Sequence, residues 1–340
     1  MKILILKPSS LGDVVQALPV LRSLKRHLPG SRIYWWIETG LAPLLEDDPD
    51  LAGLVLFHRR RWASPLNWGE LWRSVLWVRA QRFDWVIDLQ GLARSASFAW
   101  LANGRLTVGL DDHRELARGF YDLIVRRPSF LTHAADWYLE VLRHLRVPIA
   151  KDVEWLRPRP EIAGALREKC PANGDRWIVV QPGARWPNKR YPIDSFGQVL
   201  RQLAARDPRL RFAILGSREE QPLGLALTKE VVSRSLDLTG RTSLPEMVEW
   251  IRRCDLMISN DTGPMHIAAA LHKPLVAIFG PTEPRRTGPY GQLDSVLQLD
   301  LPCSPCLKSR CHYFKRLECL RALAPDLIVQ AALNHLGSPP

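Results

Sequence analysis

Short apolar runs alternate with longer segments of helical periodicity along the whole chain. The runs that predict β-strands are Ile3–Leu6, Ile33–Ile37, Leu54–Phe57, Trp85–Leu89 and Leu106–Gly109, and later Trp177–Gln181, Arg211–Leu215, Leu256–Ser259 and Leu275–Phe279. Between the first two runs, Leu and Val recur every three or four residues from Val14 to Leu28, which predicts a helix with one apolar face. Pro29 and Gly30 follow as a stop signal. The pattern predicts an α/β protein with parallel sheets.

The strand-helix rhythm is interrupted once, over residues 148–176, where Pro and Gly accumulate. At 340 residues the chain is also longer than one ordinary core. We therefore expect a Rossmann-like domain at 1–160, a second at 175–320, and a C-terminal helix at 321–337 that packs back on the first domain. Ligands of such folds bind at the carboxyl ends of the strands, which predicts a cleft between the two domains.

Charge adds a preference for anionic ligands but does not choose among them. The chain carries 47 Lys and Arg against 35 Asp and Glu, a net charge of +12. Nucleic acid, anionic lipid and phosphorylated small molecules all satisfy that charge. The first residues lack the pattern of a signal peptide, no apolar run approaches a membrane span, and six unevenly spaced Cys do not form a secreted disulfide pattern. We expect a cytoplasmic enzyme.

The first candidate segment is residues 7–14, a turn of small residues directly after the first strand. It brings Asp13 to the first turn of the following helix, at the ligand-binding edge of the sheet. The alternative is that Asp13 only caps the helix. The turn lacks Gly-x-Gly-x-x-Gly, so a nicotinamide dehydrogenase is disfavoured.

The second candidate segment, residues 181–192, follows the first strand of the second domain and carries Arg185, Lys189 and Arg190. Three cations at a strand end suit a diphosphate. The alternative is that the two Arg side chains are solvated loop charges. Lys189 is the stronger functional candidate.

The third candidate segment, residues 256–266, is a strand followed by a polar turn and a helix opened by a proline. Free backbone N–H groups at the helix start, around Asp261, Thr262 and Gly263, suit phosphate oxygens. Asp261 and Thr262 are equally typical helix caps, and a lone histidine such as His266 is more often structural than catalytic.

Two further motifs suggest metal ions. Cys303, Cys306, Cys311 and Cys319 could supply four zinc thiolates, although the last spacing is irregular; the alternative is a set of reduced cysteines in a Pro-containing loop. The Asp-x-Asp pair within residues 48–50 follows a helix rather than a strand, and we interpret it as a turn sequence.

Four segments taken together resemble the ADP-heptose:lipopolysaccharide heptosyltransferase family. They are residues 6–13, residues 88–92, residues 182–184 with 189–192, and residues 260–266. Their order and strand-end positions make the resemblance span nearly the whole chain. It implies a GT-B fold of two facing Rossmann-like domains, and an inverting, metal-independent glycosyltransferase without a cofactor. The first domain would take the acceptor and the second the nucleotide sugar.

The resemblance also implies roles for individual residues. Asp13 would be the general base that deprotonates the acceptor hydroxyl. Lys189 would neutralise the departing diphosphate together with the amides of Thr262 and Gly263. The remaining donor-binding positions are Gly183 and Ala184 in the turn, Glu220 at the ribose, Asp261 at a sugar hydroxyl, and His266 with an open role.

On the acceptor side, the resemblance implies Ser10, Arg60, Arg61 and Gln90. Arg60 and Arg61 precede residues 68–79, a region that would meet the anionic lipid headgroup; the alternative is an ordinary amphipathic helix with its Arg side chains in water. The implied partners are ADP-L-glycero-D-manno-heptose, a lipid A–Kdo or heptosylated core acceptor, and transiently the anionic surface of the inner membrane at its cytoplasmic face. We expect no nucleic acid.

Several alternatives stay open at this level. Gly183 and Ala184 look more like the second heptosyltransferase, whereas Ser9 and Ser10 look more like the first. A transferase of the same fold could use another nucleotide sugar for a different polysaccharide. A non-catalytic polyanion-binding protein would use the positive charge alone, and a sugar-nucleotide epimerase would need acid and base groups on both faces of the sugar.

Overall fold

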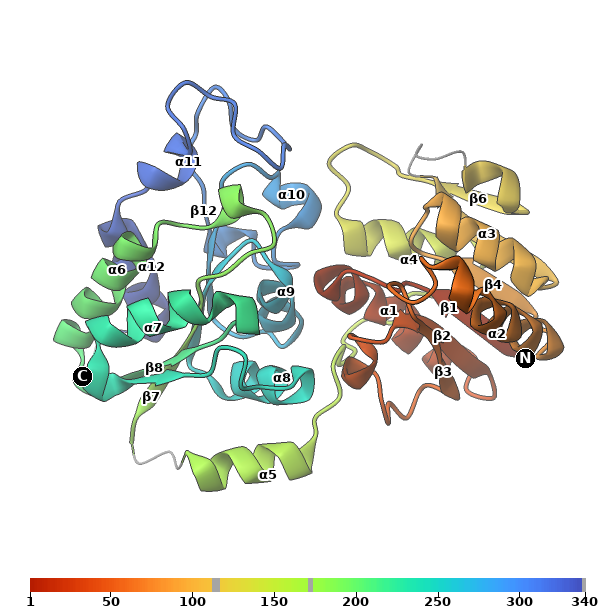
Figure 1. The fold of residues 1–340 in the computed structure, drawn as a ribbon, viewed down its shortest axis with the longest axis horizontal. Helices are drawn as coiled ribbons and strands as arrows, with labels where there is room; N and C mark the ends of the chain where they lie inside the picture. Colours follow the sequence, from red (N-terminus) through yellow and green to blue (C-terminus); the bar gives the residue numbers. More distant parts are fainter. Residues whose placement is uncertain (112–116, 171–173, 338–340) are drawn as a thin grey trace. The chain divides into compact units, whose positions relative to one another are not determined.

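A computed structural model describes residues 1–111, 117–170 and 174–337. The chain divides into two compact units, Met1–Arg157 and Pro158–Pro340, and each has its own parallel sheet covered by helices (Figure 1). No helix in the described part of the chain combines the length and the apolar character needed to cross a bilayer.

The first unit is a six-stranded parallel sheet with the order β3-β2-β1-β4-β5-β6, which is the strand order of the Rossmann fold. Helices α1 and α4 pack together, as do α2 and α3. The strands are β1 (Lys2–Leu6), β2 (Arg32–Glu38), β3 (Gly53–Phe57), β4 (Trp85–Asp88), β5 (Leu106–Asp111) and β6 (Leu123–Arg126). The helices are α1 (Leu11–His27), α2 (Trp68–Ala80), α3 (Ala93–Ala102) and α4 (Ala134–His144), with 3₁₀ turns η1 (Ala42–Leu44), η2 (Pro65–Asn67) and η3 (Ala117–Phe120).

The buried strands of this sheet read as continuous apolar runs because both of their faces are covered. Leu4 and Leu6 of β1, with Tyr34 and Trp36 of β2, belong to one core cluster with side chains of α2 and α3. The residues between them point to the opposite face, and Ile3, Ile5 and Trp35 are completely buried there.

The second unit repeats the same order, β9-β8-β7-β10-β11-β12, on its own six strands. The strands are β7 (Arg176–Gln181), β8 (Leu210–Ile214), β9 (Ser235–Asp237), β10 (Leu256–Asn260), β11 (Leu275–Ile278) and β12 (Val296–Leu297). The helices are α5 (Pro160–Lys169), α6 (Ile193–Arg206), α7 (Gln221–Glu230), α8 (Leu244–Arg253), α9 (Gly263–Ala270), α10 (Pro284–Thr287), α11 (Glu318–Arg321) and α12 (Pro325–Leu336), with 3₁₀ turns η4 (Pro187–Lys189), η5 (Arg218–Glu220), η6 (Val232–Arg234) and η7 (Leu293–Ser295).

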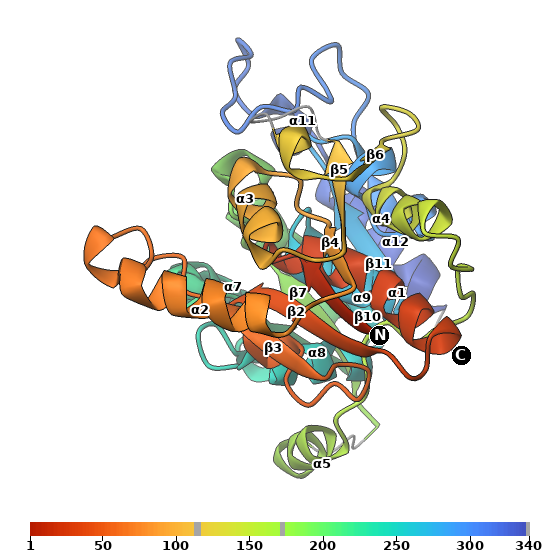
Figure 2. The same ribbon diagram turned by 90° about the vertical axis from the view of Figure 1, so that its right-hand side faces the viewer.

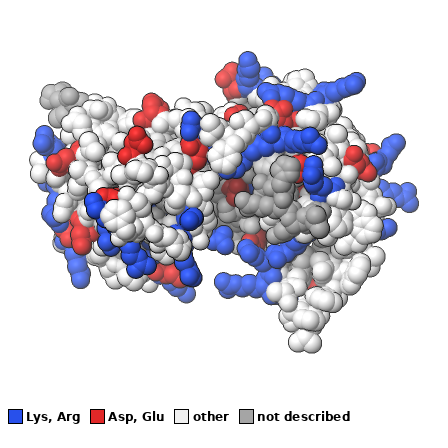
Figure 3. All heavy atoms as spheres, turned by 90° about the horizontal axis from the view of Figure 1, so that it is seen from above, with Lys and Arg blue, Asp and Glu red and all other residues white. Residues whose placement is uncertain are grey.

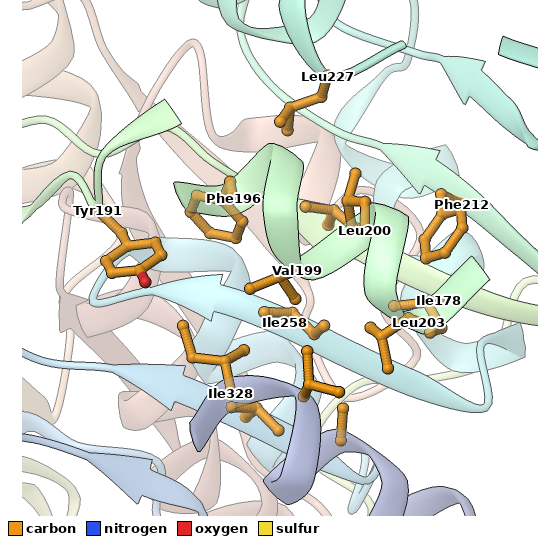
Figure 4. Close-up of a cluster of buried hydrophobic side chains, with 14 of the residues drawn as sticks. Ile178, Tyr191, Phe196, Val199, Leu200, Leu203, Phe212, Leu227, Ile258 and Ile328 are labelled. Atoms are coloured by element: carbon orange, nitrogen blue, oxygen red, sulfur yellow. The ribbon is translucent and has the colours of Figure 1, made fainter. Parts of the chain in front are cut away.

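Helix α6 and the C-terminal helix α12 close one face of this second sheet. Figure 4 shows Phe196, Leu200 and Leu203 of α6 on one side of the cluster and Ile328 of α12 on another side. All four side chains belong to the same buried core. Helix α12 also contacts β10 and β11. The structure therefore places the C-terminal helix in the core of the second unit, which differs from the expectation that it packs on the first domain.

The nine strands expected from the sequence are all present, within a few residues of their expected bounds. The pattern missed β6, β9 and β12, which lie at sheet edges. β9 and β12 are only three and two residues long and half-buried, so they lack the continuous apolar run of a covered strand. Helix α5 lies within residues 148–176, where the sequence showed no helical periodicity.

Candidate active site

Both sheets share the feature that locates ligand sites in open α/β folds. Their strand order reverses between β1 and β4 in the first unit, and between β7 and β10 in the second. Such a reversal opens a crevice at the carboxyl ends of the two strands. The segments that follow these four strands carry the residues singled out from the sequence, and each unit is described below by itself.

Asp13 lies in the first turn of α1, where its carboxylate is held by neighbours on both sides. Oδ2 accepts hydrogen bonds from the Ser10 amide (3.1 Å) and the Ser10 hydroxyl (2.5 Å). Oδ1 accepts from the Tyr138 hydroxyl at 3.1 Å, and Lys7 Nζ lies 3.9 Å away. The Asp13 side chain is still 38% exposed. Asp13 thus caps the helix start and also offers an oriented carboxylate to a ligand.

Lys7 connects the ends of β1 and β4. Its side chain is almost fully buried, and Nζ donates to the Leu89 carbonyl at 2.9 Å. The same ammonium lies 4.6 Å from the centre of the Tyr138 ring, at a distance typical of a cation–π contact. Lys7 and Tyr138 therefore contact each other and both lie at the same oxygen of the Asp13 carboxylate, Oδ1.

The loop after β4 is organised by the buried side chain of Asp88. Its Oδ1 accepts from the amides of Gln90 (2.8 Å) and Gly91 (3.2 Å), and its Oδ2 accepts from the Tyr121 hydroxyl at 2.7 Å. Burial raises the pKa of the Asp88 carboxyl, although these hydrogen bonds oppose the shift. Burial and the neighbouring Asp88 also raise the pKa of Tyr121. Asp88 thus fixes the position of Gln90.

A cavity of about 230 Å³ opens beside this loop, at the carboxyl ends of β1 to β4. Arg59, Gln90 and Arg94 line it together with the aromatic rings of Trp36 and Phe57. Among the described residues, the Gln90 side-chain oxygen is buried without a hydrogen-bond partner. The cavity thus combines two guanidinium groups and an unsatisfied amide, which suits a ligand with an anionic group and hydroxyls.

Of the expected acceptor-side residues, the structure brings Ser10 to Asp13 and Gln90 to the cavity. Arg60 is exposed and does not line the cavity, and Arg61 pairs instead with Glu70 of α2. The neighbouring Arg59, which the sequence interpretation did not select, lines the cavity.

In the second unit, three neighbouring strands deliver a compact polar cluster. Lys189 follows β7, Asp261 follows β10 and Thr282 follows β11. Lys189 Nζ donates to Asp261 Oδ2 at 2.6 Å, and the Thr282 hydroxyl donates to the same oxygen at 2.5 Å. The Asp261 side chain is 5% exposed and that of Lys189 is 18% exposed. The carboxylate thus anchors an ammonium group that still reaches the surface.

The loop that carries Lys189 is fastened to the end of β10. The Asn260 side chain donates to the Pro182 carbonyl at 2.7 Å and accepts from the Tyr191 amide at 3.1 Å. Arg190 donates to the Ala184 carbonyl at 2.8 Å, so this cation serves the loop itself. Asn260 is completely buried and has both polar groups of its side chain satisfied, which makes it a positioning residue.

The Glu220 side chain occupies the space that a side chain at position 183 would need, which accounts for the glycine there. A Cβ at position 183 would lie 1.8 Å from the Glu220 carboxylate, so only glycine leaves room for that side chain. Glu220 is held by the Ser217 amide at 2.9 Å. The turns after β7 and β8 therefore place a carboxylate directly against the Pro182–Ala184 backbone.

Helix α9 starts beside the Lys189 cluster. Thr262 is the N-cap residue with an extended backbone, and its side chain makes no capping hydrogen bond. The amides at such a helix start have no intrahelical acceptor and carry the positive end of the helix dipole. His266 lies one turn later and is largely buried. The predicted group of Asp261, Thr262 and Gly263 is thus assembled next to Lys189.

The four cysteines of the C-terminal loop line one cavity of about 220 Å³ in the second unit. Within residues 1–111, 117–170 and 174–337, however, no group of three or more His, Cys, Asp or Glu side chains is arranged to hold a metal ion. Burial and the neighbouring cysteines raise the pKa of Cys319 to about 11, which favours the neutral thiol. The zinc interpretation of these four cysteines and the alternative of reduced thiols both stay predictions.

The carboxylates of Asp48 and Asp50 form ion pairs with an arginine of the same unit. Arg22 Nη1 lies 2.7 Å from Asp50 and Nη2 lies 2.6 Å from Asp48. Arg22 is buried, so this pair of carboxylates neutralises a cation inside the first unit.

Sequence reasoning did not select Lys7, Tyr138, Arg59, Arg94 or Thr282. Thr282 lies in the loop that follows β11, next to Pro281. Tyr138 is 125 residues from Asp13 and lies on an ordinary amphipathic helix, so no local signal marks it. Lys7 directly follows β1 and Arg59 is the second residue after β3, so a search for cations at strand ends would have found them.

Comparison with known sequences gives a consistent result. The family profile described as glycosyltransferase family 9 (heptosyltransferase) matches residues 69–316. The chain is 32% identical over 327 residues to lipopolysaccharide heptosyltransferase 1 of Pseudomonas aeruginosa, covering 92% of this chain and 88% of that protein. It is 28% identical over 323 residues to lipooligosaccharide heptosyltransferase 2 of Haemophilus influenzae, covering 88% and 89%.

Solved structures show the same fold. The ADP-heptose lps heptosyltransferase II of E. coli superposes with a TM-score of 0.78 at 21% identity, covering 99% of this chain and 98% of that one. The E. coli heptosyltransferase WaaC with ADP gives a TM-score of 0.77 at 24% identity, covering 98% and 100%. The two Rossmann-like units are thus shared along the whole chain.

Proposed function

The chain belongs to glycosyltransferase family 9, the heptosyltransferase family, and from that premise we propose that it transfers heptose from ADP-L-glycero-D-manno-heptose to the inner core of lipopolysaccharide with inversion at the anomeric carbon. The observation that carries this proposal is the cluster of Lys189, Asp261 and Thr282 beside the start of α9. It combines a cation and free backbone amides, which are the groups that bind a diphosphate.

The second unit takes the donor. Lys189 binds the diphosphate and, with the amides of Thr262 and Gly263, neutralises the charge that grows on it as ADP departs. Asp261 holds Lys189 in place through Oδ2 and offers its other oxygen to a sugar hydroxyl. Glu220, which lies against Gly183, accepts hydrogen bonds from the ribose hydroxyls. Ala184 follows Gly183 in the same turn and accepts a hydrogen bond from Arg190, and His266 keeps an open role.

The first unit takes the acceptor. The Asp13 carboxylate removes the proton from the attacking hydroxyl as that oxygen bonds to the anomeric carbon and the bond from that carbon to the diphosphate breaks. A single displacement of this kind inverts the configuration. Ser10 and Tyr138 fix the carboxylate before the substrate arrives, which reduces the reorganisation needed in the transition state.

The cavity at the carboxyl ends of β1 to β4, which Ser9 of the turn before α1 also lines, supports an acidic acceptor. Arg59 and Arg94 provide two guanidinium groups, and Gln90 provides an amide oxygen that lacks a partner among the described residues. A sugar acid such as Kdo, or a heptosylated core that retains its Kdo carboxylates, fits those groups. Arg60 is exposed and Arg61 lies in the same loop, so both would meet the more distant charges of the same acceptor.

The proposal is tested by a donor and acceptor screen with mass detection of both products. The chain is incubated with ADP-heptose, ADP-glucose, UDP-glucose or GDP-mannose, and with either Kdo-lipid A or its heptosylated form. We expect release of ADP and an acceptor heavier by one heptose only in the ADP-heptose reactions, and the productive acceptor identifies the step. Turnover with a different nucleotide sugar would replace the donor assignment, and no turnover with any pair would contradict the proposal.

A further inference from the structure

The first unit exposes an apolar surface that its own fold does not use. Leu66 of η2 is 95% exposed, and Trp68, Trp72 and Leu76 of α2 are 53%, 54% and 62% exposed. Large apolar side chains of a water-soluble helix are normally directed to the core, and a cluster of exposed ones marks an interaction surface. We call these four residues the α2 stripe.

The stripe is separate from the face that holds α2 on its sheet. Leu71, Val75 and Val78 pack into the cluster beneath the helix. Trp68, Trp72 and Leu76 are four residues apart, so they form a neighbouring row that points outward. In Figure 2 the start of α2 and the loop before it project beyond β2 and β3. The stripe is therefore a ridge that a flat surface can reach.

The surroundings of the stripe are positive. Arg60 precedes it and Arg73 lies within α2, and both are exposed. Glu70 is the only acidic residue of α2, and it pairs with Arg61. On the face shown in Figure 3, Lys and Arg side chains are spread over the surface, in keeping with the net charge of +12. The partner must accept two indole rings and also attract cations.

We propose that the α2 stripe docks the protein on an anionic lipid bilayer, with Trp68 and Trp72 at the level of the headgroups and Leu66 and Leu76 beside them. Trp and Arg are the side chains that favour this interface, because each combines an apolar body with a polar end. A protein partner is disfavoured because the stripe has four side chains, whereas a stable protein interface takes roughly 20–30 residues from each partner.

This inference rests on the proposed function and adds the surface that brings the enzyme to its acceptor. Arg59 lines the cavity at the carboxyl ends of β1 to β4, and Leu66 is only seven residues further along the chain. A lipid-linked acceptor presents its sugars just above the bilayer surface. Docking through the α2 stripe therefore keeps the acceptor cavity close to the headgroups and raises the local concentration of acceptor.

The test is flotation of the full-length protein with vesicles of phosphatidylcholine, either alone or with about 30 mol% of the anionic lipid phosphatidylglycerol. The main variant is Trp68→Ser/Trp72→Ser/Leu76→Ser, and Arg73→Glu tests the charge separately. The matched control is Leu225→Ser/Val232→Ser, which removes side chains that are 54% and 72% exposed on the second unit. All variants are compared by circular dichroism and thermal unfolding.

We expect the wild-type chain and the control to bind anionic vesicles with equal partition coefficients and neutral vesicles about tenfold more weakly. The triple variant loses at least about tenfold in partitioning, and Arg73→Glu loses several-fold. Quenching of tryptophan fluorescence by bromine-labelled lipid falls in the triple variant. Unchanged flotation of the triple variant would overturn the proposal, as would equal binding to neutral vesicles or an equal loss in the control. Dimerisation of the wild-type chain that only the triple variant abolishes, without flotation, would assign the stripe to a second copy instead.

Activity separates this inference from the proposed function. On a soluble acceptor without acyl chains, the triple variant keeps the kcat/KM of the wild-type chain, whereas on acceptor embedded in vesicles its kcat/KM falls in parallel with its binding. A wild-type chain that floats but transfers no heptose contradicts only the proposed function. A wild-type chain that transfers heptose but does not float contradicts only the docking surface.

Discussion

At the scale of single residues, the structure adds hydrogen-bond partners to residues that the sequence motifs had identified, and these partners change how Asp13 and Asp261 are interpreted. Asp13 was either a helix cap or a base, and the hydrogen bonds from Ser10 and Tyr138 show that capping and an oriented carboxylate occur together. Asp261 was expected at a sugar hydroxyl, yet one of its oxygens is already occupied by Lys189 and Thr282. Strand-end motifs identified these residues, but their partners come from distant segments and could not be read from the local sequence.

Gly183 offers a test of the donor side that leaves the fold intact. In Gly183→Ala the new Cβ displaces the Glu220 carboxylate, which is the mobile end of a side chain, so stability changes by less than about 1 kcal/mol. Because that carboxylate binds the ribose in our proposal, KM for the donor should rise about tenfold or more. Steady-state kinetics and denaturant unfolding check both parts. The control is Gly164→Ala in α5, where a new Cβ would meet no atom within 4 Å and the KM for the donor should not change. An unchanged donor KM in Gly183→Ala would contradict the assignment of Glu220 to the donor site.

Tyr138 offers the corresponding test of the acceptor side. Tyr138→Phe removes the hydroxyl that donates to Asp13 Oδ1 but keeps the ring under Lys7. We expect kcat to fall about tenfold, because a hydrogen bond to a charged group is lost where the base is oriented, while the affinity for ADP measured by calorimetry stays the same. A change in ADP affinity with an unaltered kcat would contradict this role.

At the scale of elements, the sequence identified the covered strands but missed β6, β9 and β12, which are three of the four edge strands in the described residues. Central strands such as β1 and β10 are buried on both faces and read as apolar runs, whereas β9 has the sequence Ser-Leu-Asp and is set by its pairing with β8. The C-terminal helix was recognised, but periodicity shows only that a helix has an apolar face. It does not show which core receives that face.

Helix α12 provides a stability prediction for the second core. Ile328 is completely buried between α12 and the sheet, so Ile328→Ala should lower the free energy of unfolding by about 2–5 kcal/mol. The neighbouring Leu327 is 50% exposed, and Leu327→Ala should cost less than about 1 kcal/mol. Denaturant unfolding followed by circular dichroism measures both. Equal effects of the two substitutions would show that α12 does not bury this face.

The turn after β11 carries a pH-dependent contribution. Hydrogen bonds from Arg285 lower the pKa of the Glu283 carboxyl below its usual value. A lowered pKa means that this stabilisation is complete above the ordinary glutamate pKa of about 4.3 and is lost as the pH falls through the lowered value. Wild-type protein should therefore be more stable than Glu283→Gln near neutral pH, and the difference should shrink below about pH 4. Urea unfolding at several pH values checks this; a difference that is constant with pH would contradict it.

At the scale of the whole molecule, the two units repeat one strand order, and each gathers its polar residues at the reversal of that order. The alternation of apolar runs along the sequence was sufficient to predict this architecture. The resemblance of four strand-end segments was sufficient to predict the family, which the match over residues 69–316 confirms. The cavity with Arg59 and Arg94 was not predictable, because its lining comes from several segments that only the folded sheet brings together.

The proposed division of labour assigns the donor to the second unit and the base to the first. Removing the base should therefore abolish transfer without affecting the nucleotide. Asp13→Asn is the appropriate substitution, because asparagine keeps the size of the side chain and still accepts hydrogen bonds from Ser10 at the helix start, but it cannot take up a proton.

The most direct measurement compares wild-type protein and Asp13→Asn for heptose transfer from ADP-heptose and, in parallel, for ADP affinity by calorimetry. The account predicts that the rate of transfer falls at least about a hundredfold, in line with the loss of a general base, while the Kd for ADP stays within about twofold. Transfer by Asp13→Asn at the wild-type rate would contradict the central claim.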